Sequence, residues 1–568
     1  MEITKKKTNK LVIVILINLV IFGMANILFD IKYEQVDDFI IYNLYSGLDG
    51  TYNVHGVYIH PVICFIIGLF FRILPMINWH SIFLLSMQFL CFTLIGYTLL
   101  KKHDNGVAIV LYTLFASIFY TALLMLIQYT SVAALLIATS FLLLLDGLEK
   151  KEPIKLGKKL LLFVLFSLGI MIRMQSLLII LPFMAIYFII FMIEYREKTK
   201  EKVQIVKMLQ YDIGYLVITM VVMLSNQLIY QTDSTYQEFM EYHEIRATLH
   251  DIIYVDYEEN KEIFDEIGWS QNDHYMFYTF NFGDEEIFSK ENLEKILNYK
   301  IQKDGKYPFD MDMTRIKDNF MTQVMNENTY IMILFVGIFI LCLLKESKMK
   351  QTILVLGTTI AIHLLFVIIG RAMLRVVIPE YIMGTALLIY HLELTKSEIK
   401  DKVKNCAIMV GMITMICLLV GKSYNYDYQL EDYKSTQDII NYTKEHKENA
   451  YLYTVPSLQY RYLAYSVYQM PPKASFSNLR VMGGWDMFTG NYYDFKERYQ
   501  LDGNLLDLLK DNVYLIDGDV YWSGRRYDDY KANVVLAIKK HYNVDVICEK
   551  QKEFDNLAIY KVKQIEKD

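Results

Sequence analysis

Carboxylates gather in one stretch of the chain, DIKYEQVDDFIIYNLYSGLDGTYNVHGVYIHP at residues 30–61, directly after the first apolar run. Its acidic residues are Asp30, Glu34, Asp37, Asp38 and Asp49. Carboxylates beside a bilayer are costly, so their concentration at this place favours a functional site. A carboxylate can act as a general base, because a hydroxyl must lose its proton as it forms a new bond. We therefore predict that this loop is the catalytic edge of a membrane enzyme.

Asp37 and Asp38 are adjacent, and neighbouring side chains on a helix diverge by about 100°. The two carboxylates therefore cannot both face one substrate atom. One interpretation is structural: either residue caps the helix FIIYNLY and satisfies its first backbone N–H groups. The other interpretation makes one carboxylate the general base and leaves the second to position or cap.

Arginines stand at the ends of apolar runs in two places. Arg173 lies in LFSLGIMIRMQSLLIILP, and Arg371 and Arg375 lie in IIGRAMLRVVIPE. The guanidinium fork matches phosphate oxygens in a bidentate manner. We predict that at least one of these arginines binds a lipid phosphate. The alternative is that they snorkel to the interface or pair with Glu380.

Two weaker motifs complete the set of candidate site residues. His60 precedes Pro61, which fits the first turn of a helix, and Arg72 follows near the end of the same apolar segment. His60 is a candidate for binding the same lipid phosphate or the group that it carries, and capping of the helix is the structural alternative. In the tail, VMGGWDMFTG places Trp485 beside Asp486. This pair suits the binding of an acceptor sugar, because an aromatic face stacks on a sugar ring and a nearby acid can bind its hydroxyls. The alternative is a buried tryptophan with a structural role.

Composition places the chain among polytopic α-helical membrane proteins. Of its 568 residues, 54% are hydrophobic, and many apolar runs reach the length of about 20 residues that a spanning helix needs. The motifs of Walker loops, GxSxG hydrolases, HExxH zinc proteases and paired-cysteine metal sites are missing from the sequence. We expect no nucleic-acid partner and no nucleotide-driven transport.

Hydropathy and the distribution of lysine and arginine predict about eleven crossings with a cytoplasmic N-terminus. The predicted spans are 11–29, 79–100, 106–126, 129–146, 160–172, 174–193, 210–229, 329–345, 351–370, 376–391 and 405–421. The segment 57–74 is predicted to lie along the interface, because a further crossing there would invert every later loop.

The predicted domain organisation has two parts. Residues 1–421 form a transmembrane domain with outer loops at 30–78 and 230–327, and the second loop carries 22 Asp and Glu against 9 Lys and Arg. Residues 422–568 alternate short strand-like runs (AYLYTV, NVYLID, VDVICEK, LAIYKV) with helical sequence. This pattern predicts an extracytoplasmic α/β domain.

With these features together, the chain resembles the GT-C superfamily of membrane glycosyltransferases, such as the protein O-mannosyltransferases, the aminoarabinose transferases and their bacterial relatives. The resemblance rests on the acidic pair in VDDF, on YIHP before an interfacial helix, and on the spans and outer C-terminal domain. Asp38 stands where the mannosyltransferases have Glu, and Val62 stands where a second proline is common.

The resemblance implies a cell-membrane enzyme that uses a polyprenyl-phosphate-linked sugar at the outer face and a glycan, lipid or protein of the cell envelope as acceptor. It makes Asp37 the catalytic base and gives the arginines contact with the lipid phosphate. A divalent cation is possible beside the carboxylates, although no ligand spacing defines its site. Two alternatives stay open: a transporter or flippase of lipid-linked saccharides, and a non-catalytic cell-surface assembly factor.

Overall fold

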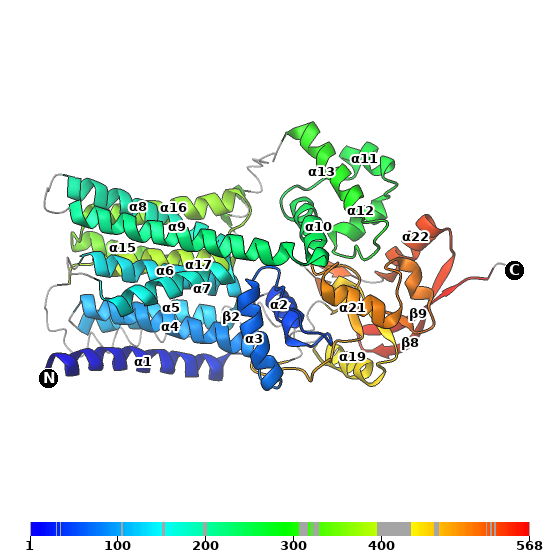
Figure 1. The fold of residues 1–568 in the computed structure, drawn as a ribbon, viewed down its shortest axis with the longest axis horizontal. Coiled ribbons are helices and arrows are strands. Elements are labelled where there is room, and N and C mark those ends of the chain that lie inside the picture. The colour runs from blue at the N-terminus through cyan, green and yellow to red at the C-terminus, as the bar shows by residue number, and fades with distance from the viewer. Residues whose placement is uncertain are drawn as a thin grey trace.

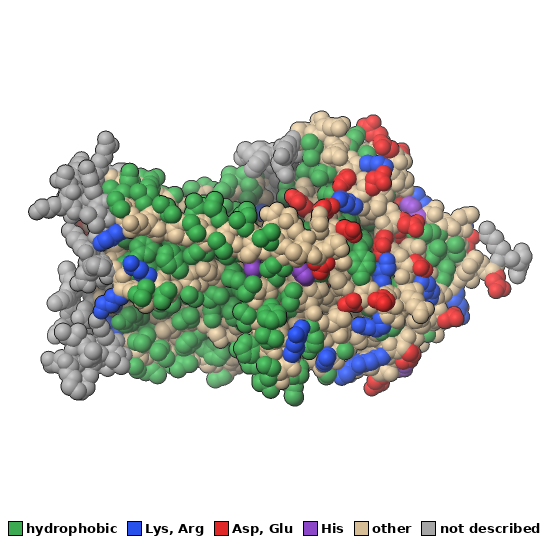
Figure 2. All heavy atoms as spheres, in the orientation of Figure 1, with side chains coloured by type: hydrophobic (Ala, Val, Ile, Leu, Met, Phe, Trp, Pro, Cys, Tyr) green, Lys and Arg blue, Asp and Glu red, His purple; other side chains and the backbone are tan. Residues whose placement is uncertain are grey.

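The computed structural model consists of a long helical bundle joined at one end to a mixed outer region (Figure 1). It describes residues 2–29, 31–34, 36–103, 106–149, 154–196, 202–305, 316–317, 320–321, 329–394, 433–458, 465–518, 520–522, 525–527 and 530–566. Hydrophobic side chains cover the visible face of the bundle, and acidic and basic side chains gather over the outer region (Figure 2). This division is typical of a protein whose bundle lies in lipid and whose outer region lies in water.

Seven of the described helices are long and apolar enough to cross a membrane. They are Lys10–Leu28 within α1 (Glu2–Leu28), α4 (Trp79–Lys102), α5 (Gly106–Met125), α6 (Tyr129–Glu149), Met174–Met192, which joins the 3-10 turn Met174–Ser176 to most of α8 (Leu177–Arg196), Ile205–Gln231 within α9 (Lys202–Gln231) and α16 (Met349–Ile368). Three further predicted spans are shorter helices, α7 (Leu156–Ile172), α15 (Thr329–Leu344) and α17 (Leu374–His391). The predicted span at 405–421 lies outside the described residues.

The segment predicted to lie along the interface is α3 (Pro61–Ile73), a helix of 13 residues. At a rise of about 1.5 Å per residue it is too short to cross a hydrocarbon core of about 30 Å. It runs across the end of the bundle instead of along it (Figure 1). One side of α3 is buried, and the other exposes Val62, Phe65, Ile66, Leu69, Phe70 and Ile73. An apolar face of this kind fits a helix lying at the membrane surface.

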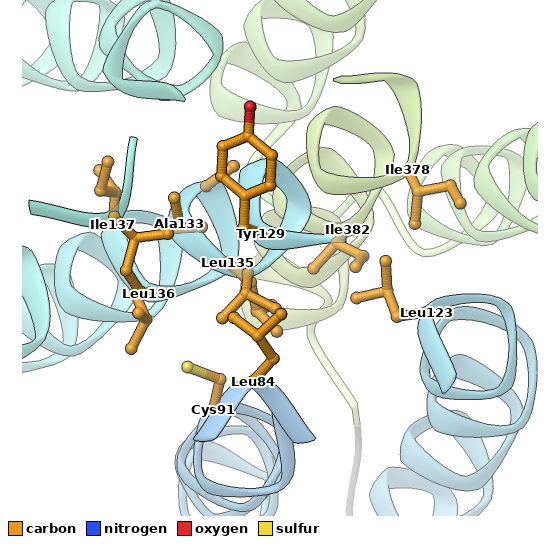
Figure 3. Packing of buried hydrophobic residues seen from close by; sticks show 14 of the residues in the cluster. Leu84, Cys91, Leu123, Tyr129, Ala133, Leu135, Leu136, Ile137, Ile378 and Ile382 are labelled. Carbon is orange, nitrogen blue, oxygen red and sulfur yellow. The ribbon is translucent and has the colours of Figure 1, made fainter. Parts of the chain in front are cut away.

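Helix α6 is the centre of the bundle and is buried along its whole apolar length. In the core, side chains of α6 pack among residues of α4, α5 and α17 (Figure 3). The labelled residues are Leu84, Cys91, Leu123, Tyr129, Ala133, Leu135, Leu136, Ile137, Ile378 and Ile382. A tightly packed central helix gives the residues at its outer end fixed positions.

The C-terminal region contains a five-stranded sheet in the order β4-β3-β5-β9-β8. Its strands are β3 (Ala450–Tyr453), β4 (Leu479–Val481), β5 (Val513–Gly518), β8 (Val546–Phe554) and β9 (Leu557–Gln564). The pairs β3–β4 and β3–β5 are parallel, and β5–β9 and β8–β9 are antiparallel. All four strand-like runs seen in the sequence form strands, and the prediction of an α/β domain is confirmed. A separate hairpin joins β6 (Val520–Trp522) to β7 (Arg525–Tyr527).

Helices pack beside this sheet, and its edge strand β8 is largely exposed. The helices are α19 (Tyr433–Glu445), α20 (Val455–Leu458), α21 (Gly490–Tyr499) and α22 (Lys531–Tyr542), with a 3-10 turn at Leu505–Leu509. Alternate residues of β3 face different cores: Tyr451 and Tyr453 join the core of the bundle, and Ala450 joins a second, outer core. The sheet therefore connects the bundle to the outer region.

The acidic loop between α9 and α15 folds as a helical lobe with α10 (Ser234–Asp251), α11 (Lys261–Glu266), α12 (Gln271–Tyr278) and α13 (Lys290–Asp304). This lobe shares the outer core with the C-terminal sheet. Buried Asp284 ties the two together, accepting hydrogen bonds from the Leu505 backbone N–H (2.9 Å) and the Tyr542 hydroxyl (2.7 Å). The lobe and the C-terminal region thus pack as one outer module, although the chain between them passes through the bundle.

Candidate active site

The acidic loop is held over the outer end of α6. Strand β1 (Lys32–Tyr33) pairs in parallel with β2 (Leu126–Ile127), which immediately precedes α6. The next element, α2 (Val36–Ser46), begins beside this pair and carries Asp37 and Asp38 in its first turn. Acidic residues are favoured in the first turn of a helix, because they oppose the positive end of its dipole.

Asp38 is fully buried and faces the bundle. Its Oδ1 accepts hydrogen bonds from the Tyr129 backbone N–H (3.1 Å) and from His80 Nε2 (3.0 Å). The other nitrogen of the His80 ring bonds to the Tyr45 hydroxyl, which completes a buried chain of three side chains. Burial, and next the charge of Asp37, raises the pKa of the Asp38 carboxyl well above its ordinary value. This environment favours the neutral acid and suits a residue that fixes α2 on α6.

Asp37 faces the opposite way, toward the outer module, and its side chain is partly exposed. Its Oδ1 accepts a hydrogen bond of 3.2 Å from the indole Nε1–H of Trp485. Burial raises the pKa of the Asp37 carboxyl, and Arg375, Trp485 and Arg173 counteract part of that rise. The divergence expected for adjacent acids is therefore observed, and Asp37 is the one that shares its surroundings with two arginines.

Arg173 follows the last residue of α7 in an extended conformation, and its backbone N–H donates to the Gly169 carbonyl. Its guanidinium lies over the ring of Tyr58 at 4.5 Å and near the ring of Tyr129 at 5.6 Å. Its Nη1 is buried and has no hydrogen-bond partner among the described residues. A buried donor without a partner costs free energy, so this nitrogen is suited to an anionic ligand.

Arg375 occupies the first turn of α17, next to α6, where Ser131 Oγ donates to its carbonyl at 3.1 Å. Its Nη1 is likewise buried, with no hydrogen-bond partner in the part of the chain that the structure describes. Arg371, in contrast, donates to the Asp251 carbonyl at 2.7 Å. Arg173 and Arg375 thus lie close to Asp37, and each has a buried N–H donor without a partner among the described residues. Arg371 instead donates to a backbone carbonyl.

Trp485 reaches Asp37 because two glycines shape its loop. Gly483 and Gly484 both adopt positive φ, at 144° and 84°, and the Gly484 N–H donates to the Phe280 carbonyl at 3.0 Å. A Cβ on Gly483 would lie 2.1 Å from the same carbonyl oxygen. The loop is therefore pressed against the helical lobe at a distance that only glycine permits.

The substitution Gly483→Ala is expected to displace this loop and the Trp485 indole with it. We expect a loss of about 2–3 kcal/mol of stability, because both the backbone conformation and the contact with Phe280 are incompatible with a side chain. Thermal unfolding of the purified protein measures the loss. Gly157→Ala is the matched control, since a Cβ there meets nothing within 4 Å. Equal unfolding temperatures for the two variants would contradict the close approach.

Two other predicted residues have structural partners. His60 caps α3: its Nδ1 accepts from the Val62 backbone N–H (3.3 Å), and its Nε2 bonds to Ser225 Oγ (3.0 Å). Asp486 is buried and forms a salt bridge of 3.1 Å with Arg480 Nη2. The structure therefore brings Asp37, Arg173, Arg375 and Trp485 together, and it gives His60 and Asp486 positions that hold the surrounding segments.

Sequence reasoning missed several members of the site. Tyr58, Tyr129 and His80 complete the inner wall, and His243 and Arg246 of α10 form the outer wall beside Trp485. Tyr58 lies two residues before the His-Pro motif, and this was its one local signal. Among the described residues, no group of three or more His, Cys, Asp or Glu side chains forms a metal site.

The fold and this site define a multi-pass α-helical membrane protein with an α/β region and a carboxylate–arginine centre where bundle and outer module meet. No protein-family model and no curated protein matches the chain. The solved structures similar to it include ArnT from Cupriavidus metallidurans in the apo state, with a TM-score of 0.40, 9% identity and coverage of 97% of this chain and 98% of that one. ArnT from the same organism bound to undecaprenyl phosphate is similar at a TM-score of 0.39 and 11% identity, with the same coverage.

Proposed function

We propose that this protein is a membrane glycosyltransferase that moves a sugar from a polyprenyl-phosphate-linked donor to a cell-envelope acceptor. The observation that carries the proposal is the surroundings of Asp37. A partly exposed carboxylate shares one electrostatic environment with Arg375 and Arg173, and each arginine has a buried donor with no partner among the described residues. This combination supplies a base and an anion site at the edge of a membrane bundle.

In the proposed reaction, the acceptor hydroxyl attacks the anomeric carbon of the donor sugar. Asp37 takes the hydroxyl proton as the new C–O bond forms. The bond between the anomeric carbon and the phosphate oxygen breaks on the opposite side, so that configuration at the anomeric carbon inverts. The phosphate leaves with the bonding electrons, and Arg173 and Arg375 stabilise its growing charge. Asp38 positions α2 through its bonds to His80 and Tyr129.

The proposed orientation places the outer module on the extracytoplasmic side and the N-terminus in the cytoplasm. Lysines at the far end of the bundle support it: Lys102 and Lys348 both pair with Glu149 there. A lysine-rich end is typical of the cytoplasmic side. The donor would then enter from the membrane, and the outer module would contact the acceptor.

A transporter of lipid-linked saccharides is the second candidate, and one observation favours it. Glu380 of α17 is fully buried in the bundle, and neither of its carboxylate oxygens has a hydrogen-bond partner among the described residues. Ionisable groups inside a membrane often mark a transport pathway. A transporter would move its lipid across the bilayer without cleaving the glycosyl bond.

Purified protein in lipid nanodiscs tests the proposal directly. We expect it to release undecaprenyl phosphate from at least one member of a panel of undecaprenyl-phosphate hexoses and aminopentoses when envelope extract supplies the acceptor. Mass spectrometry follows the lipid product. In proteoliposomes, movement of the intact sugar-bearing lipid without cleavage would instead establish transport and overturn the transferase.

A further inference from the structure

Tyr58 links the two walls of the site. Its ring covers the guanidinium of Arg173 on the bundle side, and its hydroxyl lies 3.3 Å from His243 Nε2 on α10. The Trp485 ring is 5.1 Å away, between centroids. Tyr58 is partly exposed, whereas His243 and Arg246 behind it are buried. The tyrosine is therefore the member of this group that a substrate can reach.

Hydrogen-bond accounting fixes the direction of the Tyr58 hydroxyl. Arg246 Nη2 lies 3.1 Å from His243 Nδ1, and a guanidinium can only donate, so Nδ1 is the acceptor. Burial, followed by the charge of Arg246, lowers the pKa of His243 to about 3, which keeps the ring neutral. A neutral ring that accepts at Nδ1 carries its proton on Nε2. His243 therefore cannot accept the phenolic proton, and its Nε2–H faces both the Tyr58 hydroxyl and the Trp485 backbone carbonyl.

The phenolic proton of Tyr58 is consequently left for another acceptor. Within the described residues, the hydrogen bond with His243 is the one that this hydroxyl makes. Asp37 lies near enough for its charge to act on Tyr58, so the hydroxyl borders the proposed reaction centre. A donor aimed at this place, with no protein acceptor assigned to it, points to an oxygen atom of a ligand.

We infer that Tyr58 donates a hydrogen bond to the sugar of the lipid-linked donor, with His243 and Arg246 acting as positioning residues that set its direction. The inference rests on the proposed function. The sugar is favoured over the phosphate because of where the two ends of Tyr58 lie. Its ring lies against Arg173, where the phosphate would bind, and its hydroxyl points toward α10 and the outer module. The group attached to the phosphate on that side is the sugar, and the Tyr58 hydroxyl is the partly exposed donor that faces it.

Binding of two lipids distinguishes this role from a structural one. The probes are undecaprenyl phosphate and the sugar-bearing undecaprenyl phosphate that the panel above identifies, each measured against purified protein in nanodiscs. We expect Tyr58→Phe to lower affinity for the sugar-bearing lipid by about tenfold, the usual effect of one lost hydrogen bond, and to leave affinity for undecaprenyl phosphate unchanged. The variant removes a single oxygen atom and should fold.

Two substitutions at His243 test the direction of the hydrogen bond. His243→Gln places an amide donor near the position of Nε2 and is expected to keep the preference for the sugar-bearing lipid. His243→Asn retains an acceptor for Arg246 but no donor for Tyr58, and is expected to lose that preference. Equal losses for both lipids, or no loss in Tyr58→Phe, would overturn the inference while leaving the transferase intact. Failure of wild-type protein to bind either lipid would instead contradict the proposed function.

Discussion

Replacing Asp37 with asparagine is expected to lower kcat by about a thousandfold and to leave the protein folded in the membrane. The amide has nearly the same shape but cannot take a proton from the acceptor hydroxyl. Its oxygen can still accept from the indole of Trp485, so the contact between α2 and the outer module should persist. Turnover is measured in nanodiscs with the sugar-bearing lipid, and thermal unfolding reports the fold.

Asp38→Asn is the most informative comparison, because it changes the adjacent acid in the same chemical way. The surroundings of Asp38 favour the neutral acid, which an amide imitates, and the amide oxygen can accept from both Tyr129 and His80. We expect turnover per folded molecule to fall much less than in Asp37→Asn. Asp265→Asn, on the exposed surface of α11, controls for the loss of an acidic side chain. If Asp38→Asn abolishes turnover and Asp37→Asn retains it, the base has been assigned to the wrong residue.

The sequence carried most of the information needed for the bundle, because hydropathy over about 20 residues is a strong physical signal. It also predicted four of the five strands in the outer sheet, and the segment that it placed along the interface forms the short helix α3. Strand β4 was missed because its three residues, Leu479–Val481, give too short a run for a periodic pattern. The shared core of the helical lobe and the C-terminal sheet was missed for a different reason: two segments separated by spans give no local sign that they pack together.

Site residues could be predicted from the sequence where a charged side chain stands at a place in which burying it is costly. They could not be predicted where only the packing of distant segments brings them together. Arg173 interrupts apolar sequence and Asp37 lies in an acidic loop directly after the first apolar run, and both situations are rare enough to be informative. Trp485 is 448 residues from Asp37, and nothing near it in the chain shows that its indole reaches that carboxylate. His80 and His243 lie in ordinary helical sequence. Their roles follow from the hydrogen-bond donors and acceptors that surround them in space, such as Arg246 beside His243 and Asp38 beside His80.

The assembly explains why the outer module is needed for a site at the membrane edge. The bundle supplies the arginines and, through α6, the platform on which α2 rests. The outer module supplies Trp485 on one side of Asp37 and His243 behind Tyr58 on the other. Together they bury the Asp37 carboxylate enough to raise its pKa, which would bring the proposed general base closer to the pH at which it must work.

Substitution of Arg173 or Arg375, each of which has a buried Nη1, by glutamine is expected to weaken binding of undecaprenyl phosphate by about 10- to 100-fold, the effect of losing a charge-assisted hydrogen bond. Arg173→Gln and Arg375→Gln remove both the positive charge and the planar guanidinium group. Arg→Lys at the same positions keeps the charge but loses the planar bidentate geometry, so recovery should be partial. Arg72→Gln is the matched control, because Arg72 is exposed at the end of α3 and packs on Tyr52. Equal affinity in all these variants would show that the phosphate binds elsewhere.

Arg375→Gln should also change how turnover depends on pH. This change distinguishes an Arg375 side chain that acts on the Asp37 carboxyl from one that acts elsewhere. Burial raises the pKa of Asp37, and Arg375 is the strongest of the groups that lower it. Without that positive charge the pKa rises further, and the base becomes protonated at a higher pH. The acid limb of the kcat profile should therefore move toward neutral pH in Arg375→Gln and stay in place in Arg72→Gln. An acid limb that does not move would mean that Asp37 and Arg375 are uncoupled, and the carboxylate–arginine centre would lose its physical basis.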